Sequence, residues 1–320
     1  MGIHSIFASR GKAALLLAAF AAIAACESSD SPTNPDPDPD PDPEPEFDFS
    51  RPLLAFETDR DGNWEIYVAT EDGMEVANIT NSPFTEWDVD WSPDRQQIAY
   101  RSDEEGDTDL FVMDRDGSNP VNLTNHPADE ADPSWSPDGS RIAFRSNRDG
   151  DSELYVMDSD GQNVQRLTYH EDVDAEPRWS PDGTKILWRT TRSGNSDLWV
   201  MDVAEDADTL VVSNFVNVTD HPAFECAPEW GPDSFVISFV TDRDGDNEVY
   251  LMNIDGTEVR NLTNSPNSSE FWSGWSLDGL TIVFDSNRNG NDDLFLIDVD
   301  GTDLRPLIVD DDTDEVPRWR

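Results

Sequence analysis

The sequence predicts an all-β protein, a six-bladed β-propeller, from three observations: regularly spaced tryptophans, hairpin turns within each interval, and an unpaired strand at the C-terminus. The tryptophans lie 44, 44, 51, 45 and 44 residues apart, at Trp91, Trp135, Trp179, Trp230, Trp275 and Trp319. Internal repeats of roughly 45 residues are typical of propellers, whose blades are four-stranded antiparallel sheets.

Each repeat contains signals for four short strands. In one copy, a strand ending at Trp135 is followed by a Ser-Pro-Asp-Gly turn at 136–139 and by β-rich runs at 142–144 and 154–157, and a last short run ends at Thr168. Asp-Gly and Asn-Gly turns between apolar runs predict hairpins. We therefore expect four antiparallel strands per blade, with the strand that ends in tryptophan innermost.

The two ends of the repeat array predict that the ring closes. Residues 53–80 supply three strands without a preceding tryptophan strand, whereas residues 316–319 form such a strand with only Arg320 after it. Pairing the last strand with the first unit completes a sixth blade and leaves no open inner edge. A linear solenoid is the alternative, but it would need capping units. We expect the propeller over residues 52–320.

The first 25 residues are predicted to be a secretory signal. Arg10 and Lys12 precede an uninterrupted apolar run from Ala13 to Ala25, which is too short to span a bilayer. The run ends in Ile-Ala-Ala before Cys26, and this ending resembles a bacterial lipoprotein signal. The resemblance implies that Cys26 becomes the lipid-modified N-terminus, while an ordinary signal peptide cleaved near Ala25 is the alternative.

Residues 26–51 are predicted to be the lipidated cysteine and an acidic tether. Between Pro35 and Glu46 proline alternates with acidic residues, a composition that favours an extended polyproline conformation. The lipoprotein resemblance implies anchoring in the bacterial cell envelope, with the protein periplasmic or surface-exposed. Glu27 after the cysteine favours the outer membrane over the inner one.

The repeats also resemble a known family. The pattern Trp-Ser-Pro-Asp-Gly, Ile-Ala-Phe, Tyr-Val-Met-Asp and Leu-Thr, seen most fully in residues 135–168, resembles the TolB-like β-propeller repeat, a WD-like repeat of bacterial envelope proteins. The resemblance covers residues 52–320 and implies the propeller fold. By analogy it implies binding of another envelope component.

Composition excludes some partners. Sixty-nine acidic residues against 21 basic ones give a net charge of −48. Such a surface repels phosphate backbones and anionic membranes, so we expect no nucleic acid binding and membrane contact through the lipid anchor only. The two cysteines, Cys26 and Cys226, exclude a disulfide framework, and Cys226 is expected to be buried and unpaired. We expect a monomer.

A carboxylate lies five residues before every repeat tryptophan. In a propeller, equivalent positions on the innermost strands form a ring, so these side chains are candidates for a channel-mouth site that binds a cation or a basic peptide. The alternative is structural, with each acid capping its loop or pairing with an arginine of the next repeat. The six candidates are Glu86, Glu130, Asp174, Glu225, Glu270 and Asp314.

Three histidines fall at equivalent positions, nine residues before the tryptophan, at His126, His170 and His221. If their loops converge, three imidazoles from neighbouring blades can bind a transition metal. A metal-dependent, oligouronide-lyase-like enzyme, an activity known for some TolB-like propellers, would require this feature. A structural role at the loop entry is the alternative.

The turns between the second and third strands are acidic and resemble the start of a calcium loop. The strongest examples are Asp59 with Asp61 and Asp242 with Asp244. Tight turns also demand short polar residues and glycine, so a purely structural turn is the alternative. We expect no required cofactor, with Ca²⁺ as the open possibility at these turns.

Taken together, these features predict a membrane-anchored envelope lipoprotein whose propeller is a non-catalytic scaffold that binds an envelope protein or a glycan. The sequence predicts no catalytic nucleophile, because the one serine in a glycine-rich context, Ser276, belongs to the repeat turn. The metal-dependent glycan-active enzyme and a calcium-binding structural envelope protein remain the two alternatives.

Overall fold

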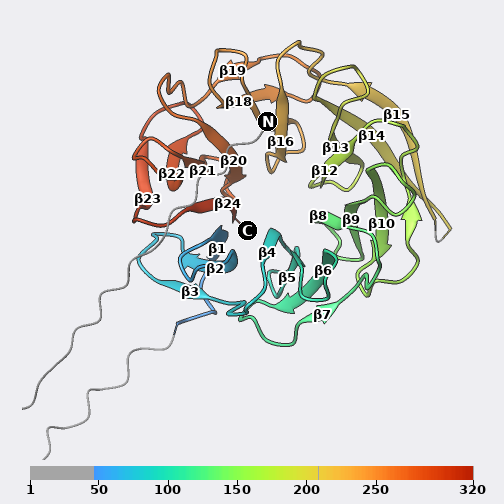
Figure 1. Cartoon of the computed structure of the whole chain (residues 1–320). Helices are drawn as coiled ribbons and strands as arrows, with labels where there is room; N and C mark the ends of the chain where they lie inside the picture. Colours follow the sequence, from blue (N-terminus) through green and yellow to red (C-terminus); the bar gives the residue numbers. More distant parts are fainter. Residues whose placement is uncertain (1–46, 208, 320) are drawn as a thin grey trace, which may run out of the picture. The chain divides into compact units, whose positions relative to one another are not determined.

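The computed structural model describes residues 47–207 and 209–319. Within this part of the chain, 24 strands form six four-stranded antiparallel sheets, which are arranged as blades around one axis (Figure 1). The prediction of an all-β, six-bladed propeller is therefore confirmed. The signal segment, Cys26 and most of the tether lie outside the described residues. In the described part, no helix long and apolar enough to cross a membrane occurs.

The first three blades follow the predicted strand pattern, with the strand that ends in tryptophan innermost (Figure 1). From the axis outward they comprise β24 (Asp314–Trp319), β1 (Leu53–Thr58), β2 (Glu65–Thr70) and β3 (Val76–Asn78) in blade 1; β4 (Glu86–Trp91), β5 (Gln97–Ser102), β6 (Asp109–Asp114) and β7 (Val121–Asn122) in blade 2; and β8 (Glu130–Trp135), β9 (Arg141–Ser146), β10 (Glu153–Asp158) and β11 (Gln165–Arg166) in blade 3.

The other three blades repeat this order. They comprise β12 (Asp174–Trp179), β13 (Lys185–Thr190), β14 (Asp197–Asp206) and β15 (Thr209–Asn217) in blade 4; β16 (Glu225–Trp230), β17 (Val236–Thr241), β18 (Glu248–Asn253) and β19 (Arg260–Asn261) in blade 5; and β20 (Glu270–Trp275), β21 (Thr281–Ser286), β22 (Asp293–Asp298) and β23 (Arg305–Ile308) in blade 6.

The ring closes where the sequence predicts. The C-terminal strand β24 pairs antiparallel with β1, and the register places Trp319 opposite Leu54 and Asp314 opposite Thr58. Blade 1 therefore takes its innermost strand from the end of the chain and its other three strands from the beginning of the array. This pairing removes the unpaired inner edge that an open array would expose.

The hydrophobic core consists of six clusters, one between each pair of neighbouring blades. Between blades 1 and 2, for example, Leu53 and Val68 pack with Trp91 and Ile98. The repeat tryptophan of each blade belongs to the cluster shared with the preceding blade. Burial of a large aromatic surface at every interface is the main force that holds the blades together.

The folded unit begins before the expected boundary at residue 52. Phe47 and Phe49 pack against the cluster between blades 1 and 2, with their rings 4.8 Å apart. The carbonyl oxygen of Arg51 accepts a hydrogen bond from Arg115 Nη2 at 2.7 Å. Burial of the two phenyl rings explains why the last residues of the predicted tether join the propeller.

Each innermost strand is interrupted by a β-bulge where it faces the second strand. In five blades the bulged residue has a positive φ of 49–56° although it is not glycine. A bulge inserts one residue and turns the following side chains relative to a regular strand. The five residues are Asp88, Asp132, Glu176, Ala227 and Val316.

The 51-residue tryptophan interval is explained by a long outer hairpin in blade 4. Its outermost strand, β15, has nine residues, whereas the outermost strands of the other blades have two to four. The hairpin contacts blade 3, where the Gln165 side chain bonds both the backbone N–H and the carbonyl oxygen of Leu210, at 3.1 and 2.6 Å.

Candidate functional site

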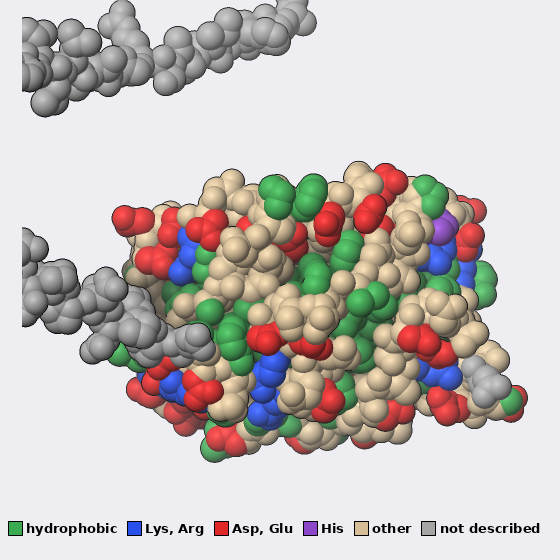
Figure 2. Space-filling model, turned by 90° about the horizontal axis from the view of Figure 1, so that it is seen from below, with side chains coloured by type: hydrophobic (Ala, Val, Ile, Leu, Met, Phe, Trp, Pro, Cys, Tyr) green, Lys and Arg blue, Asp and Glu red, His purple; other side chains and the backbone are tan. Residues whose placement is uncertain are grey.

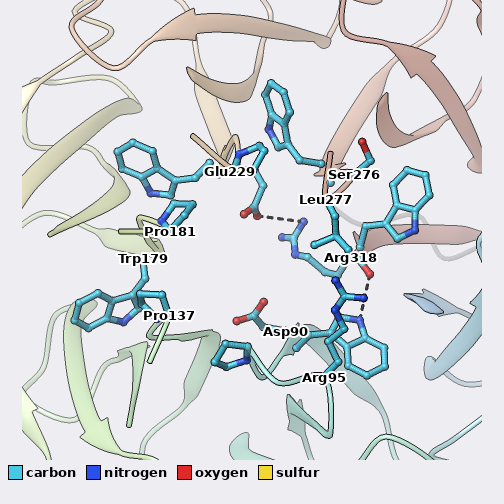
Figure 3. Close-up of a pocket in the computed structure, with 16 residues that line it drawn as sticks. Asp90, Arg95, Pro137, Trp179, Pro181, Glu229, Ser276, Leu277 and Arg318 are labelled. Carbon is cyan, nitrogen blue, oxygen red and sulfur yellow. Dashed lines mark hydrogen bonds and ion pairs between the residues drawn. The ribbon is translucent and has the colours of Figure 1, made fainter. Parts of the chain in front are cut away.

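A cavity of about 240 Å³ lies at the mouth of the central channel where the innermost strands end. The turns that follow these strands supply its rim, and the ends of the strands supply its floor (Figure 3). Concave sites with apolar walls and a few convergent polar groups are typical of ligand binding. The rim includes the repeat residues Pro93, Pro137, Pro181, Pro232 and Leu277.

The floor carries charged side chains from strands of three different blades, namely Asp90, Glu229 and Arg318. Arg178 contacts Glu229 but does not itself line the cavity. Arg178 on β12 and Arg318 on β24 both face Glu229 on β16, and the same carboxylate oxygen, Oε2, lies 3.2 Å from Arg178 Nε and 3.7 Å from Arg318 Nη1. Glu229 and Arg318 point toward one another across the axis (Figure 3). Burial and the nearby Arg178 charge lower the pKa of Arg318, with Glu229 opposing the shift.

Arg95 supplies a further guanidinium from the turn after β4. In the equivalent turns Gly139 and Gly183 have φ values of 74° and 71°, and Arg95 adopts a φ of 59° in the same place. A positive φ costs a non-glycine residue about 1 kcal/mol or more. A large cationic residue therefore occupies a position where the repeat otherwise uses glycine, and its side chain lines the cavity (Figure 3).

Tryptophans form the walls of the cavity but offer little free surface. Trp91, Trp179 and Trp230 are 1%, 7% and 4% exposed. Their indole N–H groups point into the structure in two cases, since Trp91 Nε1 donates to the carbonyl oxygen of Arg318 at 3.3 Å and Trp230 Nε1 donates to that of Arg178 at 3.0 Å. These three tryptophans therefore offer little ring surface, whereas Trp275 and Trp319, which also line the cavity, are half-buried.

The outer surface is strongly acidic, in contrast to the cavity. In the side view of Figure 2, acidic side chains gather along both rims of the face in view, with basic side chains scattered singly between them. The net charge of −48 makes this field repel polyanions and attract cationic segments. The cavity is lined by two arginines, Arg95 and Arg318, and two acids, Asp90 and Glu229, so it is less acidic than the surface around it.

The structure places the six predicted ring carboxylates at the first residue of each innermost strand. This is the opposite end of the strand from the cavity, about 17 Å away at 3.3 Å per residue. All six are buried, at 0–2% exposure. Five of them form an ion pair with an arginine of the turn between the second and third strands of the same sheet: Glu130 with Arg148, Asp174 with Arg192, Glu225 with Arg243, Glu270 with Arg288 and Asp314 with Arg60.

These contacts correspond to the structural alternative, with one correction. The arginine comes from the same sheet, not from the next repeat, because the turn between the second and third strands folds back beside the start of the innermost strand. Each arginine also lies over two aromatic rings of its own blade, as Arg148 does over Phe144 and Tyr155 at 5.4 and 5.0 Å. A buried acid held in this way is not exposed to an external partner.

Blade 2 lacks this arginine, because Glu104 occupies the position. Glu86 instead accepts hydrogen bonds from Ser82 Oγ at 2.6 Å and Ser102 Oγ at 3.2 Å. Burial raises the pKa of Glu86 to about 7, against the lowering effect of the serine hydrogen bonds. In every blade the acid at the start of the innermost strand is therefore held by its surroundings. In blade 2 the partners are serine hydroxyl groups in place of the arginine.

Three acids at the bulges connect neighbouring blades. Asp88 Oδ2 accepts the backbone N–H of Asp132 at 3.2 Å, Asp132 Oδ2 accepts that of Glu176 at 3.1 Å, and Glu176 Oε2 accepts that of Ala227 at 2.7 Å. Each acid also pairs with an arginine of its own second strand, as Asp132 does with Arg145 at 2.8 Å. Burial opposes the ionisation of Asp132, but the charge and hydrogen bond of Arg145 outweigh it and lower its pKa to about 2.

The three histidines do not form a metal site. Each lies in the loop before its own innermost strand, and its Nδ1 accepts a backbone N–H two residues later, as His126 does from Ala128 at 3.1 Å and His221 from Ala223 at 3.1 Å. His170 contacts Asp172 at 3.0 Å. Among the described residues, no group of three or more His, Cys, Asp or Glu side chains is arranged to hold a metal ion. These contacts favour the structural role at the loop entry over a transition-metal site formed by the three histidines.

The acidic turns use their carboxylates in structural hydrogen bonds. Asp61 Oδ2 accepts from the hydroxyl of Tyr67 and from Asn78 Nδ2, and Asp244 Oδ2 accepts in the same way from Tyr250 and Asn261. Asp59 Oδ1 and Asp242 Oδ1 accept the backbone N–H groups of Thr313 and Phe224, at 3.0 and 2.9 Å. The four aspartates thus hold their turns against neighbouring strands and loops and do not converge on one point.

Comparison with known proteins identifies the family. The sequence model of the TolB beta propeller domain matches residues 121–217 and 208–320, more than half of the chain. The chain belongs to the TolB beta-propeller family. Among curated protein sequences there is no significant match.

Solved structures share the fold of this TolB-family propeller. TolB from Acinetobacter baumannii is 22% identical, with a TM-score of 0.70, over 85% of this chain and 67% of that chain. A putative TolB from Agrobacterium tumefaciens is 20% identical, with a TM-score of 0.62, over 83% and 90%. Oligogalacturonate lyase from Vibrio parahaemolyticus is 15% identical, with a TM-score of 0.57, over 82% and 76%. At these identities the likeness shows the fold alone.

The charged residues that line the cavity of this TolB-family propeller were not among those predicted from the sequence. The residue before each repeat tryptophan varies, and the six are Asp90, Ser134, Arg178, Glu229, Gly274 and Arg318. In a repeat that is otherwise closely copied, a position that changes chemistry from blade to blade is a signal of a local role. Arg95 gives a second signal, because it replaces the glycine of the Ser-Pro-Asp-Gly turn.

Proposed function

We propose that this chain is a lipid-anchored cell-envelope protein whose propeller is a non-catalytic scaffold that binds a partner protein at the channel-mouth cavity. The observation that carries the proposal is the cavity itself, which combines proline and leucine rim residues with a floor of Asp90, Glu229 and Arg318. Apolar contact area with a few oriented polar groups is what recognition of a protein segment requires.

The chemistry of the cavity favours binding over catalysis. Its two acids are engaged, since Asp90 Oδ2 accepts the backbone N–H of Trp135 at 2.8 Å and Glu229 Oε2 contacts both arginines. A carboxylate held by such partners orients a ligand and is a poor proton acceptor. A protein partner is favoured over a glycan because three of the five tryptophans that line the cavity, Trp91, Trp179 and Trp230, are at most 7% exposed, whereas sugar stacking uses an open aromatic face.

The envelope location rests on the sequence of the N-terminal segment together with the family. Residues 1–25 have the pattern of a lipoprotein signal that ends at Cys26, and two solved structures with this fold carry the name TolB. A tether of about 20 residues that extends at about 3 Å per residue places a propeller up to roughly 60 Å from its anchor. We propose the outer membrane as the anchoring membrane, with the propeller in the periplasm or at the surface.

The test is capture of a partner by the full chain from a cell-envelope extract after mild crosslinking. Leu277, 56% exposed, lies on the cavity rim, so Leu277→Glu introduces a charge into the contact area. We expect the captured protein to be reduced at least fivefold by this variant, because a buried charge without a partner costs several kcal/mol at an interface.

The matched control is Leu280→Glu, three residues later in the same turn and 61% exposed, but outside the cavity. It adds the same charge to the same acidic surface. Equal loss of capture in both variants would indicate a general charge effect and would contradict the proposed site.

Labelling cells with a radioactive fatty acid tests the anchor, and a chain that takes up no label, or takes it up equally after Cys26→Ser, would contradict lipidation at Cys26.

A further inference from the structure

We propose that the channel-mouth cavity recognises a carboxylate group of a peptide, and that the guanidinium groups of Arg95 and Arg318 bind it. This inference rests on the proposed function, because it names the chemistry of the group that enters the same cavity. Both arginines line the cavity from different blades, Arg95 from the turn after β4 and Arg318 from β24 (Figure 3).

At the cavity floor, the guanidinium group of Arg318 has an N–H that makes no hydrogen bond with the described residues. Its side chain is 7% exposed, and Nη1 makes long contacts with the carbonyl oxygens of Ser273 and Pro317, at 3.2 and 3.4 Å. Its Nε is buried and has no hydrogen-bond partner among the described residues. An unpaired N–H of a buried guanidinium is costly, so Arg318 is held at the floor with part of its hydrogen-bonding capacity unmet.

Arg95 is the second donor. Its side chain makes no hydrogen bond and no ion pair with any residue in the described part of the chain, although acidic residues outnumber basic ones more than threefold in the sequence. Its backbone adopts the strained φ of 59° at a position that is glycine in the turns of Gly139 and Gly183. Strain at a specific residue is a sign of function when the strained residue also lines a cavity.

Both acids of the cavity have other partners besides these two donors. Asp90 is used by the backbone of Trp135, and the contact between Glu229 and Arg318 is 3.7 Å, longer than the 3.2 Å contact between Glu229 and Arg178. The charged residues that line the cavity are two cations, Arg95 and Arg318, and two anions, Asp90 and Glu229. The surrounding surface is strongly acidic, so this balanced cavity repels an anion less than that surface does.

The shape of the cavity and the overall charge select a peptide carboxylate. The planar guanidinium matches a planar carboxylate with two parallel hydrogen bonds. A volume of about 240 Å³ admits a short end of a chain or a single side chain, and the proline rim suits apolar neighbours. Polyanions such as nucleic acids and polyuronates are strongly repelled by the net charge of −48, whereas a peptide with one carboxylate is repelled far less.

The carboxylate can come from a chain terminus or from an aspartate or glutamate side chain, and three peptide pools distinguish these sources. The pools are N-acetylated tripeptides of random neutral sequence with a free C-terminal carboxylate, the same tripeptides as amides, and amides that contain one aspartate. Binding to the full chain is measured by equilibrium dialysis with mass-spectrometric detection. We expect at least tenfold tighter binding of one or both carboxylate pools than of the neutral amides, in line with a charge-assisted hydrogen bond.

The variants are chosen so that folding is preserved. Arg95→Gly restores the residue that other repeats use and relieves the positive φ, so it should leave the melting temperature unchanged or higher. It should weaken binding of the carboxylate peptides at least tenfold. The matched control is Ser234→Gly, which relieves the equivalent φ of 58° in blade 5 outside the cavity and should leave binding unchanged.

Two outcomes would overturn the inference. The first is equal binding of neutral amides and carboxylate peptides, which would leave the cavity as a binding site of different chemistry and the proposed function intact. The second is unchanged affinity of Arg95→Gly for carboxylate peptides. Failure of the proposed function has a different signature, since it appears as undiminished partner capture by Leu277→Glu.

Discussion

Glu229 and Arg318 meet across the propeller axis, with Oε2 and Nη1 3.7 Å apart, although they belong to strands β16 and β24 of blades that do not adjoin. The same oxygen lies 3.2 Å from Arg178 Nε. One carboxylate thus offsets two guanidinium groups that are nearly inaccessible to water, at 9% and 7% exposure.

Removal of this carboxylate should destabilise the propeller. Glu229→Gln keeps the size of the side chain but removes the one carboxylate that pairs with both buried cations, and we expect the free energy of unfolding to fall by about 3 kcal/mol. Urea denaturation followed by tryptophan fluorescence measures the change. The double variant Glu229→Gln with Arg318→Met should recover part of the loss, and a double variant as unstable as the single one would contradict this explanation.

Replacing Glu104 with arginine should stabilise blade 2. Tyr100 and Phe111 already stack there with centroids 5.6 Å apart, as the ring pairs beneath the arginines of the other blades do. An arginine at 104 would lie over these rings and reach the buried Glu86. We expect Glu104→Arg to raise the free energy of unfolding by about 1–3 kcal/mol, the sum of a cation–π contact and a charged hydrogen bond.

The reciprocal change in blade 3 provides the control for this prediction. Arg148→Glu removes the arginine that pairs with Glu130 at 3.0 Å and places two acids together, so it should lower stability by at least as much as Glu104→Arg raises it. If Glu104→Arg is neutral at pH 8 while Arg148→Glu is strongly destabilising, the equivalence of the two positions is wrong.

Stability should fall as the pH rises through the range from about 4.5 to about 7. Burial raises the pKa of Glu86, Glu225 and Glu315 to about 7 and that of Asp314 to about 6. Since these groups bind protons more tightly in the folded state than in the unfolded state, the folded state holds more protons in this range, and each rise in pH favours unfolding.

The urea midpoint measured at about pH 5 and about pH 8 in roughly 1 M NaCl, which screens surface repulsion, tests this pH dependence. We expect the higher midpoint at pH 5. Below about pH 4 the trend reverses, because Asp132, with its pKa lowered to about 2, loses its ion pair on protonation. A midpoint that rises from pH 5 to pH 8 would show that the buried acids are not protonated.

The fold was predictable because its determinants are local and repeated. The spacing of Trp91 to Trp319 sets the period, the Asp-Gly turns define hairpins, and the unpaired strand 316–319 specifies closure. Each of these signals is read from residues adjacent in sequence. The long β14–β15 hairpin was visible only as an interval of 51 residues, since nothing in the local sequence predicts that Leu210 contacts Gln165 of blade 3.

The site was not predictable because it depends on where side chains point after a bulge. Strict alternation along the innermost strand would place the acids at Glu86 and Asp88 on one face. The bulge at Asp88, with a φ of 56°, breaks this alternation, and Asp88 faces the backbone of blade 3. The arginines at 178 and 318 converge only through ring closure, which brings β24 to the axis beside β4 and β20.

Salt should stabilise the chain and calcium should add little to that effect. Sodium chloride screens the mutual repulsion of 69 acidic residues, so the melting temperature should rise steadily up to molar concentrations. The carboxylates of Asp61 and Asp244 are already bonded to tyrosine and asparagine side chains. A large rise in melting temperature caused by micromolar Ca²⁺ at constant ionic strength, and reversed by a chelator, would show that the acidic turns bind the ion.

We propose that a partner contacts the channel mouth on the side where the innermost strands end. The direct measurement is photo-crosslinking in intact cells from a benzophenone residue placed at position 277 on the cavity rim, compared with one at position 105 in the turn between β5 and β6 at the opposite end of the blades. We predict a discrete crosslinked species from position 277 that Arg95→Gly diminishes, and none from position 105. A crosslinked species that forms from position 105 and not from position 277 would contradict the assignment.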